Sequence, residues 1–298
     1  NVCDADVAII TKIALDHQKT LGHDVKSIFR EKLGIIKKDS AVAFACYSDD
    51  LREFSAEYLR DMDHGDVSRA VLRTSDLDIS AVSNFPDPLR YSIVGLPFGN
   101  DILEGELGYP SAFQAENFAL SSLGVYLFFE KKGMTIDIER LKEAGRKAVM
   151  PARMQRISSE PLVYLDGCHN PAAVESSLDE LCRLAKYGKK IRILYTAMDD
   201  KDIGSVFKVF DSRREYISRI SLVQIDYRRA ASLGKLRSIA EQYHFVGEDY
   251  DNIEEAYGGI MNDFRDDEVV LICGSFYLCS DILSLSGFCE QSIGCNRF

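Results

Sequence analysis

Apolar and polar positions along the chain switch repeatedly between a strand-like and a helix-like period. Short apolar runs typical of buried strands occur at residues 7–13, 41–46, 162–165, 191–195, 220–225 and 269–273. Apolar residues spaced three or four apart predict helices over residues 25–36, 50–62, 115–131, 137–148, 172–186, 203–212, 235–244 and 253–264. Strands that alternate with helices in this way predict an α/β fold with largely parallel sheets.

The length of 298 residues favours two domains, since a domain typically has roughly 150 residues. Residues 149–156 resemble a connector, after which a new series of strands and helices begins. We therefore expect one domain over residues 1–150 and a self-contained doubly wound domain over 151–298. Residues 66–110 hold several short extended runs, and residues 284–298 lose their periodicity, which predicts a tail.

Composition and charge narrow the class of protein. The chain is 46% hydrophobic and 28% charged, as in ordinary globular proteins. No apolar run approaches the ~18 residues that span a bilayer, and Asp4 and Asp6 interrupt any signal peptide. A net charge of −11 argues against nucleic-acid binding, and eight cysteines without a CxxC pair indicate free thiols in a reducing cytoplasm.

Three common site motifs do not occur in the sequence. There is no GxGxxG after a predicted strand, no GxxxxGK[ST] and no GxSxG. The sequence therefore gives no support for a dinucleotide-binding fingerprint, a phosphate-binding P-loop within these residues, or a nucleophile elbow.

Two features in the first half could carry chemistry. His17 follows Asp16 at the end of the first predicted strand, where it could ligate a divalent metal, although a capped turn explains the same pair. Lys32 lies four residues after Ile28 and three after Phe29, which places it on the apolar face of its predicted helix. A buried lysine needs a partner or a modification, and the alternative is that its stem reaches out to solvent.

A polar cluster follows the strand at residues 162–165. Asp166 and His169 lie between this strand and a helix whose start is marked by Asn170 as N-cap and Pro171 as first residue. A helix N-terminus at the carboxyl end of a parallel strand is a favourable place for a phosphate or a ribose. A capped turn with incidental polar residues is the alternative.

Two further groups are weaker candidates. Gln114 and Asn117 stand in the first turn of the predicted helix at 115–131, where they could contact a base edge or simply begin the helix. The turn at residues 199–202 follows one strand and precedes a helix, and taken alone it is typical of a solvated, capped turn.

Taken together, the segments resemble the folylpolyglutamate synthase/dihydrofolate synthase family of the Mur-ligase superfamily. The similarity runs in order through Ile10-Thr11, Leu15-Asp16-His17, Leu21-Gly22, Glu31-Lys32-Leu33-Gly34-Ile35-Ile36-Lys37, Gln114 with Asn117, Pro151-x-Arg153-Met154, Asp166-Gly-x-His169-Asn170-Pro171, Asp200-Lys201-Asp202 and Gly274-Ser275. Departures stand at Met150 with Ala152, where the family usually has Trp and Gly, and at Cys168 and Leu33, where it usually has Ala.

The resemblance implies the remainder of a Mur-ligase-type central ATP-binding domain followed by a C-terminal doubly wound, Rossmann-like domain. It implies an ATP-dependent ligase that joins glutamate to a carboxylate of dihydropteroate or a folate through an acyl phosphate. In the first domain His17 would ligate Mg²⁺, Lys32 would be carbamylated and take part in catalysis, and Asn117 would face adenine.

In the second domain the resemblance implies that Arg153 and His169 contact phosphate and take part in catalysis, and that Asp166 contacts the ribose or the linker. The glutamate pocket has weaker candidates in Asp200, Lys201, Asp202 and Ser275. The implied cofactors are ATP and Mg²⁺, and the partners are a folate or dihydropteroate and L-glutamate. We further expect a cytoplasmic monomer that binds neither nucleic acid nor membrane.

Members of this family carry a P-loop, a catalytic Glu and a Gly-rich loop before the point that Asn1 matches. We therefore expect the chain as given not to catalyse ligation alone, although its second domain should fold. Two alternatives remain, a peptidoglycan-precursor Mur-type ligase and a non-catalytic nucleotide-binding homologue. The sequence leaves open whether the ligase acts as dihydrofolate synthase, folylpolyglutamate synthase or both.

Overall fold

The structure is a computed structural model that describes residues 2–13, 24–63, 69–82, 88–99, 101–148, 150–185, 188–245 and 247–286. The chain divides into two compact units, Asn1–Val149 and Met150–Phe298. Both combine helices with sheets, which confirms the predicted α/β class. That the first unit is the ATP-binding domain and the second unit the C-terminal ligase domain stays a prediction.

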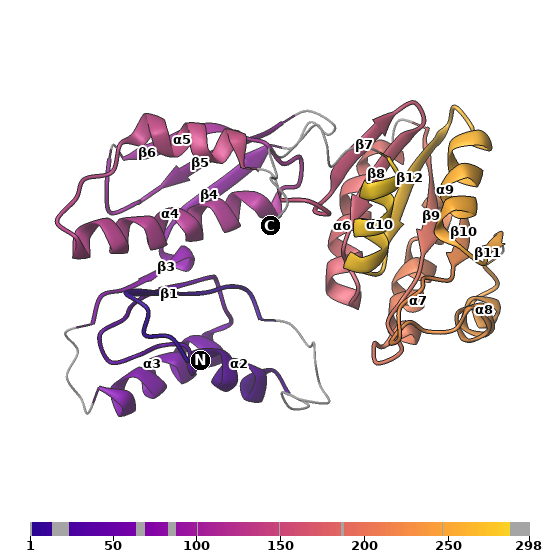
Figure 1. The fold of residues 1–298 in the computed structure, drawn as a ribbon. Coiled ribbons are helices and arrows are strands. Elements are labelled where there is room, and N and C mark those ends of the chain that lie inside the picture. The colour runs from indigo at the N-terminus through magenta and orange to yellow at the C-terminus, as the bar shows by residue number, and fades with distance from the viewer. Residues whose placement is uncertain are drawn as a thin grey trace. The chain divides into compact units, whose positions relative to one another are not determined.

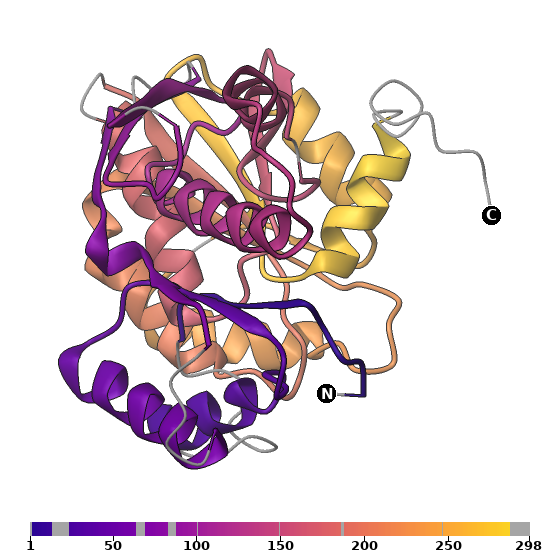
Figure 2. The ribbon, with the colours of Figure 1, turned by 90° about the vertical axis from the view of Figure 1, so that its left-hand side faces the viewer.

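The first unit begins with a parallel sheet of three strands in the order β1-β2-β3. These strands are β1 (Val7–Ile10), β2 (Ala41–Phe44) and β3 (Val71–Arg73), and the helices between them are α2 (Val25–Leu33) and α3 (Asp49–Met62). Side chains alternate along β2, so that Val42 and Phe44 pack with α2 and α3, whereas Ala43 faces the opposite side. Figure 2 shows α2 and α3 together beneath this sheet.

A second sheet in the same unit is antiparallel, in the order β4-β5-β6. After the short 3₁₀ turn η1 (Thr74–Asp76), the chain forms β4 (Asp78–Val82), β5 (Leu89–Val94) and β6 (Ile102–Leu107), and then α4 (Phe113–Lys131) and α5 (Ile138–Lys147). The expectation of largely parallel sheets is therefore wrong for this region. Its strands follow each other through short connections, which can join only antiparallel neighbours.

Helix α4 packs against both sheets of the first unit (Figure 1). Leu120, Leu123 and Leu127 pack with Ala43 of the parallel sheet, while Ala115 and Ala119 join the core beneath the antiparallel sheet. A helix covered on two sides needs apolar residues around most of its circumference. This explains why buried positions of α4 include neighbours in sequence such as Ala119 and Leu120.

The second unit is built on a six-stranded sheet in the order β11-β10-β9-β12-β8-β7, in which only β7 runs antiparallel. Its elements are β7 (Gln155–Ser159), β8 (Leu162–Asp166), α6 (Pro171–Ala185), β9 (Lys190–Tyr195), α7 (Ile203–Ser212), η2 (Arg214–Tyr216), β10 (Ile217–Val223), α8 (Leu233–Gln242), β11 (Asp249–Tyr250), α9 (Ile253–Asn262), β12 (Glu268–Cys273) and α10 (Phe276–Leu285). Residues 284 and 285 thus belong to α10 and not to a tail, while residues 287–298 lie outside the described part.

Helices cover both faces of this sheet, as the doubly wound prediction requires. Helices α9 and α10 pack on one face, where Leu194 and Ile272 join their core. Tyr195 points to the other face and contacts Phe207 and Phe210 of α7 edge-on, at centroid distances of 5.7 Å and 5.5 Å. Helices α6 and α8 each contact α7.

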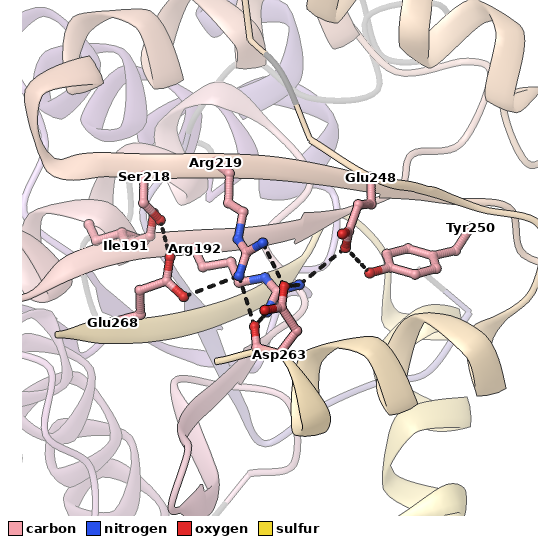
Figure 3. Close-up of polar contacts among 8 residues, drawn as sticks. All are labelled: Ile191, Arg192, Ser218, Arg219, Glu248, Tyr250, Asp263 and Glu268. Atoms are coloured by element: carbon pink, nitrogen blue, oxygen red, sulfur yellow. Dashed lines mark hydrogen bonds and ion pairs between the residues drawn. The ribbon is translucent and has the colours of Figure 1, made fainter. Parts of the chain in front are cut away.

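A network of charged side chains closes the amino edge of the same sheet (Figure 3). Arg192 of β9 is fully buried, with its guanidinium 3.5 Å from Glu248 and 3.9 Å from Asp263. Arg219 of β10 lies 2.8 Å from the Asp263 carboxylate and 3.4 Å from Glu268. The hydrogen bond from Arg219 holds the pKa of Asp263 below its usual value. These pairs compensate a buried charge that would otherwise be costly.

Candidate active site

The polar cluster after β8 lies at the carboxyl edge of the second unit's sheet. Strand β8 is followed by α6, on the face of α7, whereas its neighbour β12 is followed by α10 on the opposite face. The loops after two adjacent parallel strands therefore turn away from each other. Such a switch point opens a crevice at the carboxyl ends of the strands, where α/β proteins bind their ligands.

Asp166 organises this edge from within the fold. It is 3% exposed, and its two carboxylate oxygens accept the backbone N–H groups of Met154 and Cys168 at 2.9 Å and 2.8 Å. Burial raises the pKa of Asp166, and the two backbone hydrogen bonds oppose that shift. The carboxylate thus joins the segment before β7 to the loop after β8. Its predicted contact with ribose or the linker stays untested.

The segment that carries Arg153 is held in an unusual conformation. Ala152 and Met154, on either side of Arg153, both have positive φ angles, of 57° and 43°. Non-glycine residues rarely adopt this region, and they do so where surrounding contacts fix the chain. Those contacts are the bonds from Met154 N–H to Asp166, from Gly167 N–H to the Ala152 carbonyl, and from Ala152 N–H to Gln155.

Arg153 and His169 meet at the ring of Phe276, the first residue of α10. The Arg153 guanidinium carbon lies 4.7 Å from the ring centroid of Phe276, and the His169 ring contacts the same ring at 6.0 Å in an edge-on orientation. The Nδ1 atom of His169 donates to the carbonyl of Gly167 at 2.9 Å, which fixes the orientation of the imidazole. Sequence reasoning missed Phe276, because a single aromatic residue carries no motif.

Gly274 brings the ends of three strands together beside this ring. Its N–H donates to the carbonyl of Cys168 at 2.9 Å, and its φ of 107° suits only glycine. A methyl group on Gly274 would lie 1.8 Å from the carbonyl oxygen of Thr196, which follows β9. Ser275 is 3% exposed, and its hydroxyl accepts the N–H of Tyr277 as the N-cap of α10.

The predicted Asp200-Lys201-Asp202 turn follows β9 at the same edge. Arg229 binds Asp200 at 2.9 Å, and although burial acts in the opposite direction, this hydrogen bond contributes to a lowered pKa of Asp200. Asp202 is the N-cap of α7, with its side chain accepting the N–H of Ser205 at 3.0 Å. Lys201 is half-buried. Their predicted contact with glutamate stays untested.

The first unit has a smaller polar cluster at the carboxyl edge of its parallel sheet. Glu116 of α4 accepts the N–H of Cys46 at 3.2 Å and pairs with Lys12 at 3.1 Å. Burial, together with the charge of Glu116, raises the pKa of Tyr47, whose hydroxyl donates to the carbonyl of Thr11 at 2.7 Å. Sequence reasoning did not single out these residues, since a lone Glu in a first helical turn has no distinctive spacing.

Asn117 lies beside this cluster, one residue after Glu116 in α4. It is exposed, and its amide donates to Gln114 at 2.9 Å. The two side chains are thus hydrogen-bonded to each other. The contact of Asn117 with a base edge stays a prediction.

Lys32 of α2 lies outside the core of the first unit. It is exposed, whereas Ile28, Phe29 and Leu33 of α2 are buried. Of the two alternatives for Lys32, the structure shows the one in which the stem reaches solvent, in the last turn of α2. The predicted carbamylation of Lys32 now rests on the family resemblance alone. His17 lies outside the described residues.

Across the described part of the chain, no three His, Cys, Asp or Glu side chains gather in a way that could hold a metal ion. Among the same residues, no helix combines the length and apolar character needed to cross a membrane.

The sequence of the second unit matches a known family. Residues 152–276 match the family described as Mur ligase, glutamate ligase domain. This part of the chain, which contains Arg153, Asp166, His169 and Ser275, is therefore similar to the glutamate ligase domain of Mur ligases.

Curated relatives extend the similarity over nearly the whole chain. Dihydrofolate synthase/folylpolyglutamate synthase of Escherichia coli is 25% identical over 96% of this chain, and that of Bacillus subtilis is 28% identical over 95%. Folylpolyglutamate synthase of Lacticaseibacillus casei is 26% identical over 95%. The chain is thus a homologue of the folylpolyglutamate and dihydrofolate synthases. It spans 61% to 63% of the length of these relatives.

Solved structures agree in fold. Mycobacterium tuberculosis folylpolyglutamate synthase complexed with ADP superposes with a TM-score of 0.80 at 21% identity, over 96% of this chain and 64% of that chain. E. coli FolC in complex with DHPP and ADP superposes with a TM-score of 0.75 at 23% identity, over 97% of this chain and 63% of that chain. The backbone therefore has the fold of these ligases.

Proposed function

We propose that the chain is part of an ATP-dependent ligase that adds glutamate to a carboxylate of a folate or dihydropteroate. The homology supports the class of reaction, and one structural observation supports the site. Arg153 and His169 meet at one aromatic ring, at a switch point that also holds the N-terminus of α6. This is a favourable arrangement for the phosphates of a nucleotide.

In the proposed reaction, ATP transfers its γ-phosphoryl group to the carboxylate, and the amine of glutamate then displaces phosphate from the acyl phosphate. The guanidinium of Arg153 would neutralise phosphate charge, and a fixed orientation is what makes such a group effective. The Nδ1 proton of His169 is used by Gly167, so its ring is already oriented before a ligand arrives. Asp166 would act indirectly, because its oxygens hold the two backbone segments that present Arg153 and His169.

The finer parts of the proposal rest on the resemblance. They are Mg²⁺ bound by His17, a carbamate on Lys32, adenine against Asn117, and glutamate near Ser275 and the turn at residues 200–202. A folate or dihydropteroate and L-glutamate would be the substrates, and the protein would act as a cytoplasmic monomer. No step through the metal follows from the described residues.

The test uses the protein expressed from the complete gene, with ATP, glutamate and either dihydropteroate or tetrahydrofolate. We expect ADP release that depends on both acceptor and glutamate. Arg153→Ala should lower kcat/KM for ATP about tenfold or more, as expected for the loss of a charge-assisted contact. Arg156→Ala removes an exposed arginine only three residues away and should leave the rate within about twofold.

Three outcomes would redirect the proposal. Turnover with a peptidoglycan precursor and none with either pterin would favour a Mur-type ligase of that pathway. ADP binding without any turnover would favour the non-catalytic homologue. Equal rates for Arg153→Ala and Arg156→Ala would remove Arg153 from the site.

A further inference from the structure

Phe276 is a partly exposed aromatic residue at the start of α10. It begins α10 immediately after the N-cap Ser275, at the carboxyl edge of the sheet, and it is 41% exposed. The residues of α10 that join the core on this face are Leu278, Cys279, Ile282 and Leu283. The core beneath α10 is therefore filled by other side chains, which leaves the ring of Phe276 available for another role.

The loop after β8 is shaped to admit this ring. A methyl group on Gly167 would lie 2.3 Å from the nearest ring carbon of Phe276, far closer than real side-chain contacts. The backbone of Gly167 is held in turn by its N–H bond to the Ala152 carbonyl at 2.8 Å. The ring is thus seated closely against the backbone that leads to His169.

Two side chains of the proposed phosphate site contact this one ring. Arg153 places its guanidinium 4.7 Å from the ring centroid, within the range of a cation–π interaction. His169 presents its ring edge-on at 6.0 Å, with an interplanar angle of 63°. Arg153 belongs to the segment before β7 and His169 to the loop after β8, so Phe276 of α10 joins groups from two separate segments.

We propose that Phe276 is a positioning residue, which holds the Arg153 guanidinium and the His169 imidazole in a fixed arrangement for a nucleotide phosphate. The inference rests on the proposed function, because it assumes that the anion at this edge is the phosphate of ATP or ADP. A long arginine side chain loses considerable rotamer freedom when it is fixed on a ligand. Stacking on Phe276 restricts that freedom before the ligand binds, which lowers the cost of binding.

The variants distinguish the effect of the aromatic ring from the effect of an apolar side chain of any kind. Phe276→Leu keeps an apolar side chain and removes the aromatic ring, whereas Phe276→Tyr keeps the ring and should rescue the function. Phe264→Leu is the matched control, because Phe264 is 40% exposed and follows α9 at the amino edge. Phe276→Met serves as a second ring-free variant should Phe276→Leu fold poorly, as judged by its melting temperature.

The first measurement is binding of Mg-ADP by calorimetry to the protein expressed from the complete gene. We expect Phe276→Leu to weaken ADP binding about threefold to tenfold, in the range of one cation–π contact, and to raise KM for ATP more than it lowers kcat. Phe276→Tyr and Phe264→Leu should stay within about twofold of the wild type. If Phe276 acts through Arg153, Arg153→Ala with Phe276→Leu should bind no more weakly than Arg153→Ala alone.

The second measurement does not depend on a ligand. The ring ¹H–¹³C signal of His169, assigned with His169→Gln, should move in Phe276→Leu because the neighbouring ring current is lost, and should stay in place in Phe264→Leu. A wild-type protein that does not bind ADP would overturn the proposed function, and the phosphate role of Phe276 with it. Wild-type ADP binding together with unchanged affinity and KM in Phe276→Leu would overturn the positioning role alone.

Discussion

Replacing Gly274 with alanine should severely destabilise the second unit. The new methyl group would lie 1.8 Å from the carbonyl oxygen of Thr196, so the ends of β9 and β12 would have to separate by roughly 1 Å or more. A side chain at a φ of 107° adds strain of about 1–3 kcal/mol. The movement would also weaken the bonds from Gly274 to Cys168 and from Thr196 to Cys273, each contributing about 0.5–1.5 kcal/mol.

Together these effects predict a loss of about 2–6 kcal/mol in the free energy of unfolding, a large share of the roughly 5–15 kcal/mol of a typical protein. Gly258→Ala is the matched control, because Gly258 lies inside α9 and a methyl group there meets no atom within 4 Å. Alanine is the better helix former, so this variant should be more stable by about 0.5–1 kcal/mol.

Urea unfolding followed by circular dichroism measures both changes, and hydrogen exchange on peptides from β9 and β12 shows where protection is lost. A Gly274→Ala protein within about 1 kcal/mol of the wild type would refute the reasoning. Loss of exchange protection in the first unit instead of at β9 and β12 would show that the close approach at Thr196 is not the cause.

Two further predictions concern the connector and the charged network. Ala152→Gly should leave the free energy of unfolding within about 1 kcal/mol of the wild type, because relief of backbone strain at a φ of 57° offsets the loss of the buried methyl group. The control Ala256→Gly, in helix α9, should lower the free energy of unfolding by about 1–2 kcal/mol. Equal urea midpoints for the two variants would contradict this prediction. Asp263→Asn should reduce the loss of stability on acidification. A carboxyl group whose pKa is lowered in the folded state stabilises the fold above its usual pKa of 3.8, and this stabilisation is lost as the pH falls below that value. Parallel curves of melting temperature against pH, from pH 7 to 2.5, for the variant and the wild type would contradict this prediction.

The sequence predicted best where periodicity and local capping act alone. Helix α7 has the predicted bounds, and Asn170 caps α6 by accepting the N–H of Ala173 at 2.9 Å. The helix α10 went unassigned, although its buried positions Leu278, Cys279, Ile282 and Leu283 have helical spacing. The strands β4 and β6 also went unassigned, since their pairing depends on partners across the turns and not on their own pattern.

The same distinction holds for the site. Spacing and resemblance singled out Arg153, Asp166 and His169, and the structure brings them to one edge of the second unit. The spacing of residues could not show that the carboxylate of Asp166 accepts hydrogen bonds from backbone N–H groups, because the bond from Met154 depends on a turn with positive φ. It also could not show Phe276, whose role follows from the return of β12 between β8 and β9.

That return of β12 has a consequence for how the polypeptide acquires its shape during synthesis. Strands β8 and β9 are consecutive in the chain but are not neighbours in the sheet, because β12 occupies the place between them. A ribosome releases β12 about a hundred residues after β8, so the middle of the sheet stays open until translation has passed Cys273. Until then the exposed edges of β8 and β9 can pair with other chains, and molecular chaperones that bind nascent polypeptides would find their target in this interval.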